Sequence, residues 1–232
     1  MKKIFGTKQD NLIIIDGEDF LHLAVLRCKI GEQILCYTGD EYEYLCEITQ
    51  ISKNQAVCEI VSQNVCQGNP KREITVFQGL PKQDKLEFIM QKLTELGAKN
   101  LIPFESDFTI AKPNLNKIDR LGKISIEACK QCGRSQSVNI SSPIKFDEML
   151  NKLDEFDLVL FANETDKKIQ DINFGHLQKI AIIVGSEGGF SEQEIEKLKS
   201  KKVTMFGLGT RILRCETASV IACGLVSYLT EN

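Results

Sequence analysis

The strongest signs of chemistry in this sequence are two glycine-bearing turns near its C-terminus. One reads Gly185-Ser186-Glu187-Gly188-Gly189, and the other runs from Gly209 to Ala218. The second turn contains Arg211, Arg214 and Glu216, three charged residues next to apolar segments. These charges have two interpretations: a satisfied ion-pair network at a helix cap, or a functional site. Charge alone leaves both open.

The first turn lacks the features of a phosphate-binding loop. Its pattern is neither G-x-G-x-x-G nor a P-loop with Lys followed by Ser or Thr. A helix N-terminus attracts anions, but Glu187, Glu192 and Glu194 crowd this one. Ser191 as N-cap and Glu194 as its capping-box partner mark the helix start. We therefore expect a neutral or cationic ligand here.

Three predicted strands must position these turns. Residues 180–184 form an apolar run without polar alternation, and residues 157–162 are similarly apolar, which is typical of parallel strands buried on both faces. Residues 203–208 form the third strand. In parallel sheets, ligands bind beyond the carboxyl ends of the strands. The loops that follow these strands therefore predict one site at one edge of a sheet.

The long combination G-S-E-G-G-F-S-x-x-E followed by L-G-x-R-I-L-R-x-E-T-A resembles the knotted, SPOUT-class RNA methyltransferases. It is most similar to the RsmE family, which methylates N3 of a uridine in 16S ribosomal RNA. The stretches His22–Arg27, Thr94–Gly97 and Glu127–Arg134 also resemble that family. The likeness thus covers nearly the whole chain. Ser186 stands where the family usually has proline, which makes that turn less rigid.

The resemblance implies an α/β fold with two domains. Residues 1–70 would form a small PUA-like β-barrel that binds RNA. Residues 71–232 would form a SPOUT-type, trefoil-knotted methyltransferase domain with a parallel sheet. The family is dimeric through the knotted domain, so the resemblance also implies a homodimer. Periodicity alone does not reveal a knot.

The resemblance further implies that the cofactor is S-adenosyl-L-methionine. Its sulfonium is cationic, which agrees with the acidic turn around Glu187. Backbone groups of Leu208, Ile212 and Leu213 would recognise its adenine. The full set of implied cofactor-binding residues is Leu160, Phe161, Glu164, Val184, Gly185, Ser186, Glu187, Gly188, Leu208, Gly209, Ile212, Leu213, Thr217 and Ala218.

The expected reaction is methyl transfer to a base that must be exposed and lose its N3 proton. Arg214 is the candidate for stabilising the developing uracil anion, with Glu216 orienting it. The sequence does not identify a general base. Two alternatives stay open: a knotted methyltransferase acting on ribose 2′-hydroxyls or transfer RNA, and a ribosome-binding assembly factor without turnover.

Basic charge is concentrated in the middle of the chain. Residues 71–134 carry 12 basic and 8 acidic side chains, or +4, although the whole chain has a net charge of −3. A polyanion would therefore meet this region, although solvated helix faces can produce the same excess. The candidate RNA-binding residues are Arg27, Lys82, Lys85, Gln131 and Arg134.

Composition limits the remaining possibilities. The chain of 232 residues has no apolar run of membrane length and no signal-peptide pattern, so we expect a cytoplasmic protein without a membrane partner. The nine cysteines are then reduced thiols. A metal site is not expected, because Cys129 and Cys132 have only His22 and His176 to complete a ligand set. For these two cysteines we expect burial rather than redox chemistry.

The earlier part of the chain is expected to contain short strands first and a βαβ unit after the linker 67–70. The predicted elements are strands at 34–37 and 42–48, a helix at Glu18–Cys28, a strand at 74–78, a helix at Asp84–Leu96, a strand region at 101–104 and a helix at Lys117–Cys132.

Overall fold

The computed structural model describes residues 1–82, 85–111, 116–165 and 167–231. The chain divides into two compact units. The N-terminal unit contains residues 1–69 and 129–137, and the C-terminal unit contains residues 70–128 and 138–232. Among the described residues, no helix is long and apolar enough to cross a membrane.

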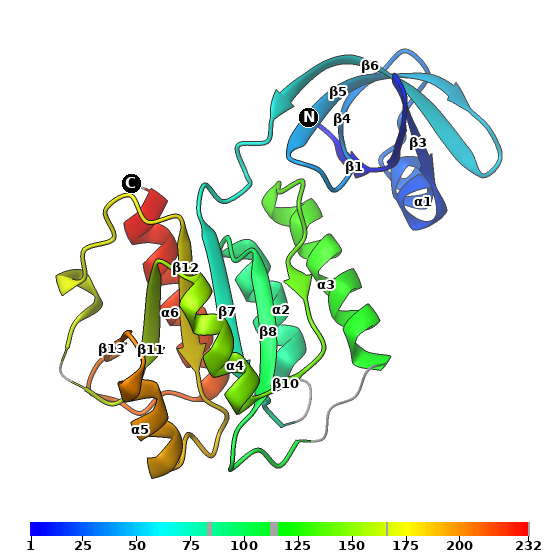
Figure 1. Cartoon of the computed structure of the whole chain (residues 1–232). Helices are drawn as coiled ribbons and strands as arrows, with labels where there is room; N and C mark the ends of the chain where they lie inside the picture. Colours follow the sequence, from blue (N-terminus) through cyan, green and yellow to red (C-terminus); the bar gives the residue numbers. More distant parts are fainter. Residues whose placement is uncertain (83–84, 112–115, 166, 232) are drawn as a thin grey trace. The chain divides into compact units, whose positions relative to one another are not determined.

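The N-terminal unit is a curved six-stranded sheet with strand order β1-β4-β5-β6-β3-β2 (Figure 1). Its elements are β1 (Lys3–Phe5), β2 (Thr7–Gln9), β3 (Leu12–Asp16), α1 (Gly17–Val25), β4 (Gln33–Tyr37), β5 (Tyr42–Ile51) and β6 (Gln55–Val65). The β5–β6 ladder shifts register between Leu45 and Cys46, and again between Ile48 and Gln50. Such bulges increase the local twist and bend a sheet around its core. The core includes Ile13, Leu23 and Ile34.

The C-terminal unit is built on a seven-stranded sheet in which every pairing is parallel. The strand order is β10-β8-β7-β12-β11-β13, and β9 also pairs with β8. The strands are β7 (Glu73–Gly79), β8 (Asn100–Glu105), β9 (Asn139–Ile140), β10 (Ile144–Lys145), β11 (Leu158–Ala162), β12 (Lys179–Val184) and β13 (Val203–Phe206). The helices are α2 (Lys85–Glu95), α3 (Asn116–Cys132), α4 (Phe146–Lys152), α5 (Glu192–Ser200) and α6 (Cys215–Glu231), with short 3-10 turns η1 (Leu153–Glu155) and η2 (Ile169–Asp171).

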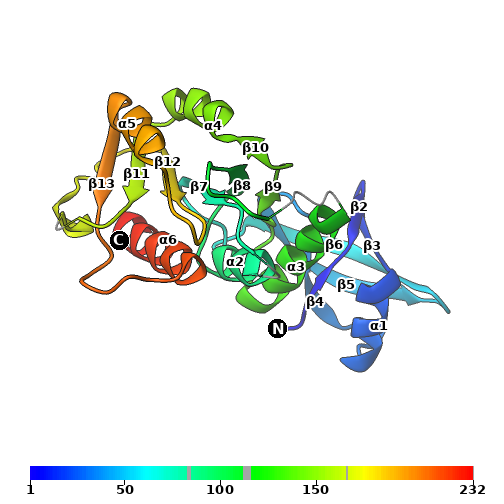
Figure 2. The ribbon, with the colours of Figure 1, turned by 90° about the horizontal axis from the view of Figure 1, so that it is seen from below.

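Helices cover both faces of this sheet, as Figure 2 shows for α2 and α6 on one side and α4 and α5 on the other. The side chains of β12 follow this arrangement. Ile180 and Ile182 belong to the core cluster that includes α2 and α6, whereas Ala181 and Ile183 belong to the cluster that includes α4 and α5. The prediction of a strand buried on both faces is therefore confirmed.

The structure also confirms the local signals around the predicted site. Strands β7 and β8 are parallel neighbours joined through α2, as a βαβ unit requires. The predicted start of that helix at Asp84 lies outside the described residues. Ser191 caps α5 and forms the capping box with Glu194. Strand β13 ends at Phe206, two residues before the predicted end at Leu208.

Candidate active site

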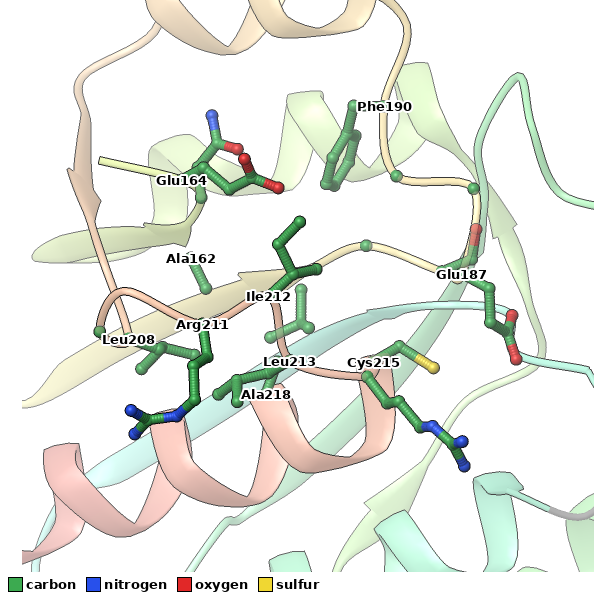
Figure 3. A pocket seen from close by; sticks show the side chains of 18 of the residues that line it. Ala162, Glu164, Glu187, Phe190, Leu208, Arg211, Ile212, Leu213, Cys215 and Ala218 are labelled. Carbon is green, nitrogen blue, oxygen red and sulfur yellow. The ribbon is translucent and has the colours of Figure 1, made fainter. Parts of the chain in front are cut away.

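A cavity of about 660 Å³ lies beyond the carboxyl ends of β11, β12 and β13 (Figure 3). The ends of these strands, the loops that follow them, the start of α6, one residue of α2 and one residue of α5 form its walls. In the view of Figure 3, Ile212 lies in the middle, with Glu164 and Phe190 on one side and Leu208 and Ala218 on the other. The three strand ends thus bring together segments that are distant in the sequence.

Most of the expected cofactor-binding residues line this cavity. They are Glu164, Val184, Gly185, Ser186, Glu187, Gly188, Leu208, Gly209, Ile212, Leu213 and Ala218. Three others do not. Leu160 and Phe161 are buried in the cores on the two faces of the sheet, because they lie within β11 rather than after it. Thr217 is exposed on α6 and is not part of the lining.

The sequence interpretation missed several residues of the lining: Ala162, Asn163, Gly189, Phe190, Ile195 and Cys215. Phe190 had a usable signal, because it follows the glycine turn directly. Its ring packs edge-on against Phe161, with ring centroids 5.0 Å apart. A Cβ on Gly185 would lie 2.8 Å from the Phe190 ring. A larger residue at the start of the turn would therefore displace the Phe190 ring.

A cluster of three charges lies at the edge of the cavity. The ammonium of Lys85 is 2.8 Å from Glu187 Oε1 and 3.2 Å from Glu216 Oε2. The backbone N–H of Lys82 also donates to the Glu187 carboxylate. The negative charge of Glu187 is thus compensated within the protein. The expectation that Glu187 makes the turn attractive to a cation needs this correction. Among the carboxylates that line the cavity, Glu164 has no ion pair within the described residues.

The contacts within this cluster stabilise the ionised form of all three side chains. Burial raises the pKa of Glu187, but hydrogen bonds from Lys85 and from backbone N–H groups outweigh it, so the pKa lies below its usual value. The pKa of Glu216 is also lowered, because hydrogen bonds that include one from Lys85 outweigh burial. The hydrogen bond to Glu187 in turn raises the pKa of Lys85.

Because the carboxyl pKa values are lowered, the cluster's contribution to the free energy of unfolding depends on pH. Each folded carboxyl binds its proton less readily than in the unfolded chain, where its pKa is about 4.3. The contribution is therefore complete above that value and is lost as the pH falls through the folded pKa. We expect Lys85→Met to flatten the loss of unfolding free energy between neutral pH and pH 3, measured by urea denaturation. Lys199→Met, which removes an exposed partner of Glu196, is the control. Parallel curves for parent and Lys85→Met would contradict this coupling.

Arg214 lines the cavity and is exposed. The expected pair between Arg214 and Glu216 is absent: in the part of the chain that the structure describes, Glu216 pairs with Lys85 and Arg214 has no ion pair. The two residues are two positions apart at the start of α6, and side chains at that spacing do not face each other on a helix. A cation at a helix N-terminus also opposes the helix dipole. Arg214 is therefore not placed to stabilise α6.

The expected RNA-binding residues differ in exposure and are divided between the two units. Arg27, Lys82 and Gln131 are exposed. Lys85 is engaged with two carboxylates at the cavity. Arg134 is only 2% exposed, which disfavours a contact from it to phosphate at the surface. Lys82 and Lys85 belong to the C-terminal unit, whereas the other three belong to the N-terminal unit.

The family model described as an RNA methyltransferase domain matches residues 67–227, and the RNA methyltransferase PUA domain matches residues 15–61. The chain is 35% identical to ribosomal RNA small subunit methyltransferase E of Bacillus subtilis, covering 94% of this chain and 90% of that protein. The protein of the same name from Rickettsia conorii is 34% identical, with 90% and 86% covered. The chain belongs to the ribosomal RNA small subunit methyltransferase E family.

Solved structures agree with membership of the methyltransferase E family. Ribosomal RNA small subunit methyltransferase E from Neisseria gonorrhoeae, bound to S-adenosylmethionine, is 28% identical and superposes with a TM-score of 0.86, covering 99% of this chain and 98% of that one. A putative methyltransferase from Legionella pneumophila, also with this cofactor, is 28% identical, with a TM-score of 0.84 and 98% and 97% covered. The predicted fold class, a parallel α/β sheet with a PUA-like domain, is confirmed.

The cysteines of this methyltransferase E family member are all free thiols. Cys129 is buried, and its thiol donates to the Gln136 carbonyl at 3.3 Å. Within the described residues, no group of histidine, cysteine or acidic side chains could hold a metal ion. Burial raises the pKa of Cys215 in the cavity to about 12. Its thiol therefore stays protonated at neutral pH and is a poor nucleophile.

Proposed function

We propose that this chain transfers a methyl group from S-adenosyl-L-methionine to N3 of a specific uridine in 16S ribosomal RNA of the small subunit. The observation that carries the proposal is the cavity beyond β11, β12 and β13. Its walls combine a glycine turn, apolar residues such as Leu208 and Leu213, and charged side chains of both signs, which are Glu164, Glu187, Lys85, Arg211 and Arg214. They offer no lysine-containing phosphate loop. The apolar residues and the glycine turn fit an adenosyl group, the carboxylate of Glu164 fits a cationic centre, and the missing phosphate loop disfavours a nucleoside polyphosphate.

The residues of the cavity have separate roles in this proposal. Backbone groups of Leu208, Ile212 and Leu213 hold the adenine, and Glu164 provides the carboxylate for the cationic part of the ligand. The bound cofactor supplies an electrophilic methyl group. Arg214 stabilises the negative charge that develops on the uracil as the N3 proton leaves. Glu216 acts through Lys85, which it contacts, rather than through Arg214.

Three further assignments belong to this proposal. Residues 1–70 form the RNA-binding domain, and residues 71–232 form the methyltransferase domain with the knot. Two copies associate through the knotted domain, which agrees with the exposed Ile221 and Tyr228 on α6. The protein works in the cytoplasm, where its substrate is assembled.

Ligand preference and product identity test the function. Calorimetry should show binding of S-adenosylmethionine and no comparable binding of ATP or NAD; tight ATP binding without response to S-adenosylmethionine would contradict the proposal. Mass mapping of 16S RNA from a deletion strain should show one uridine without its base methyl group, restored by the gene. A missing ribose methyl group would instead identify a 2′-hydroxyl enzyme, a change in transfer RNA would identify a transfer RNA enzyme, and unchanged RNA would favour an assembly factor.

Exposed cations should determine the salt dependence of RNA binding. Arg27 and Lys82 are exposed, so contacts from them to phosphate would release counterions. Arg27→Ala and Lys82→Ala should each weaken binding and reduce the slope of log K against log salt by about 0.7–0.9. Binding titrations at several salt concentrations measure this slope. Lys199→Ala on α5 is the control, and unchanged slopes for Arg27→Ala and Lys82→Ala would place both residues away from the RNA.

A further inference from the structure

A buried polar group interrupts the core next to the cavity. Gln78 lies near the end of β7, where it pairs with Val184 of β12, and it is 0% exposed. A buried primary amide is costly unless its donors and acceptor all have partners. Its Nε2 donates to the carbonyls of Gly79 at 2.9 Å and Gly185 at 3.2 Å. Its Oε1 accepts a hydrogen bond from the hydroxyl of Ser219.

The partners also determine which way the amide points. The reversed orientation would place Oε1 against the carbonyl oxygens of Gly79 and Gly185, where it finds no proton to accept. Both halves of the amide are therefore assigned by their surroundings. Gln78 joins a cavity wall on one side to α6 on the other.

Ser219 extends this connection to the opposite wall of the cavity. It is 0% exposed in α6, and its hydroxyl also lies 2.9 Å from the carbonyl of Cys215. Cys215 and Ala218, from the first turn of α6, line the cavity. The Gln78–Ser219 pair therefore links the glycine turn after β12 to the first turn of α6.

The link holds the peptide between Gly185 and Ser186. Glycine restricts the backbone little, but a planar trans peptide moves as one unit. Holding the Gly185 carbonyl therefore also fixes the direction of the Ser186 N–H. A Cβ on Gly79 would overlap the backbone nitrogen of Ser186, so the end of β7 lies directly against this peptide.

We infer that Gln78 and Ser219 are positioning residues of the cofactor site. They hold the Gly185–Ser186 peptide in one orientation and keep the glycine turn and the first turn of α6 at a fixed separation. The inference rests on the proposed function for the choice of ligand. The ordering of the turn itself does not depend on any ligand.

Three variants distinguish the hydrogen bond between Gln78 and Ser219 from the hydrogen bond between Gln78 and Gly185. Ser219→Ala removes the link to α6, Gln78→Met removes the whole amide, and Gln78→Glu keeps an acceptor for Ser219 but loses the donor to Gly185. Each should weaken S-adenosylmethionine binding on the order of tenfold in calorimetry. Gln78→Glu should bind as weakly as Gln78→Met, because the donor to Gly185 is the part that orients the peptide.

The matched control is Ser125→Ala. Ser125 is also 0% exposed in the C-terminal unit, and its hydroxyl also joins two segments, through Thr94 Oγ1 at 3.0 Å and the Val138 N–H at 2.8 Å. It is not part of the cavity lining. Ser125→Ala should lower the melting temperature as Ser219→Ala does while leaving S-adenosylmethionine affinity unchanged. Equal weakening by both serine variants would show a general loss of stability and overturn the inference.

Hydrogen exchange tests the same inference without a ligand. Amides of residues 186–189 should exchange faster in Ser219→Ala and Gln78→Glu than in the parent, and Ser125→Ala should leave them unchanged. Parental exchange in both Gln78–Ser219 variants would overturn the inference. A parent that orders this turn but does not bind S-adenosylmethionine would contradict the proposed function and leave the role of the Gln78–Ser219 pair intact.

Discussion

Arg214→Ala is expected to lower the rate of methyl transfer by a factor on the order of 10²–10³, the usual result of removing a group that stabilises developing negative charge. A guanidinium beside a neutral uracil contributes little to ground-state binding, so the loss should fall on turnover rather than on affinity for either substrate. Single-turnover rates at saturating cofactor and RNA measure it. Arg214→Lys should rescue only in part, because an ammonium lacks the planar fork.

The structure separates this expectation from a structural role for Arg214. The residue is exposed, has no ion pair among the described residues, and precedes the N-terminus of α6. Its removal should therefore leave the melting temperature unchanged or slightly higher. Thermal stability and single-turnover rate should be measured on the same preparation. A destabilised variant with the parental rate would remove Arg214 from the mechanism.

Gly207→Ala is expected to disrupt the cavity, although Gly207 itself is not part of the lining. A Cβ on Gly207 would overlap the carbonyl oxygen of Thr165, and the Gly207 N–H donates to the Lys167 carbonyl at 2.8 Å. Two backbone segments are thus in direct contact, and neither has a flexible side-chain end that can move aside. We expect about 1–3 kcal/mol of destabilisation. Cofactor binding should also weaken, because Leu208 and Gly209 of the lining follow directly.

A second glycine provides the control for this substitution. Gly122 lies in α3, and a Cβ there would meet nothing within 4 Å. Gly122→Ala should therefore stabilise the protein by about 0.4–1 kcal/mol, because alanine loses less chain entropy on folding. Chemical denaturation of both variants gives the comparison. A Gly207→Ala protein with parental stability and affinity would show that the segment at Thr165 adjusts freely.

The sequence predicted the features whose causes are local. The apolar run of β12 and the capping box of Ser191 depend on neighbouring residues, and both were read from the sequence. The residue roles at the cavity came from the family motif instead of periodicity. Leu160 and Phe161 were assigned to the site from the resemblance, although the strand predicted at residues 157–162 already contained both of them.

Long-range contacts were beyond sequence interpretation. Gln78 reads as one polar residue in an apolar strand, and its partner Ser219 is 141 positions away. Lys85 and Arg134 were predicted to be surface cations. The sequence does not show that Lys85 contacts two carboxylates or that Arg134 is buried. The two-residue strands β9 and β10 are too short to produce a periodic signal.

The division of the chain into units has a consequence for its synthesis. Residues 129–137 belong to the N-terminal unit, where the Ser135 hydroxyl donates to the Asp40 carbonyl at 2.6 Å and Asn69 accepts from the N–H groups of Ser135 and Gln136. During translation, residues 1–69 emerge from the ribosome first, but these contacts form only after residues 129–137 have emerged as well. The first unit to emerge is therefore completed late, while β7, α2 and β8 are already available to pair. A gene fragment that ends at residue 70 would encode this unit without one of its own segments.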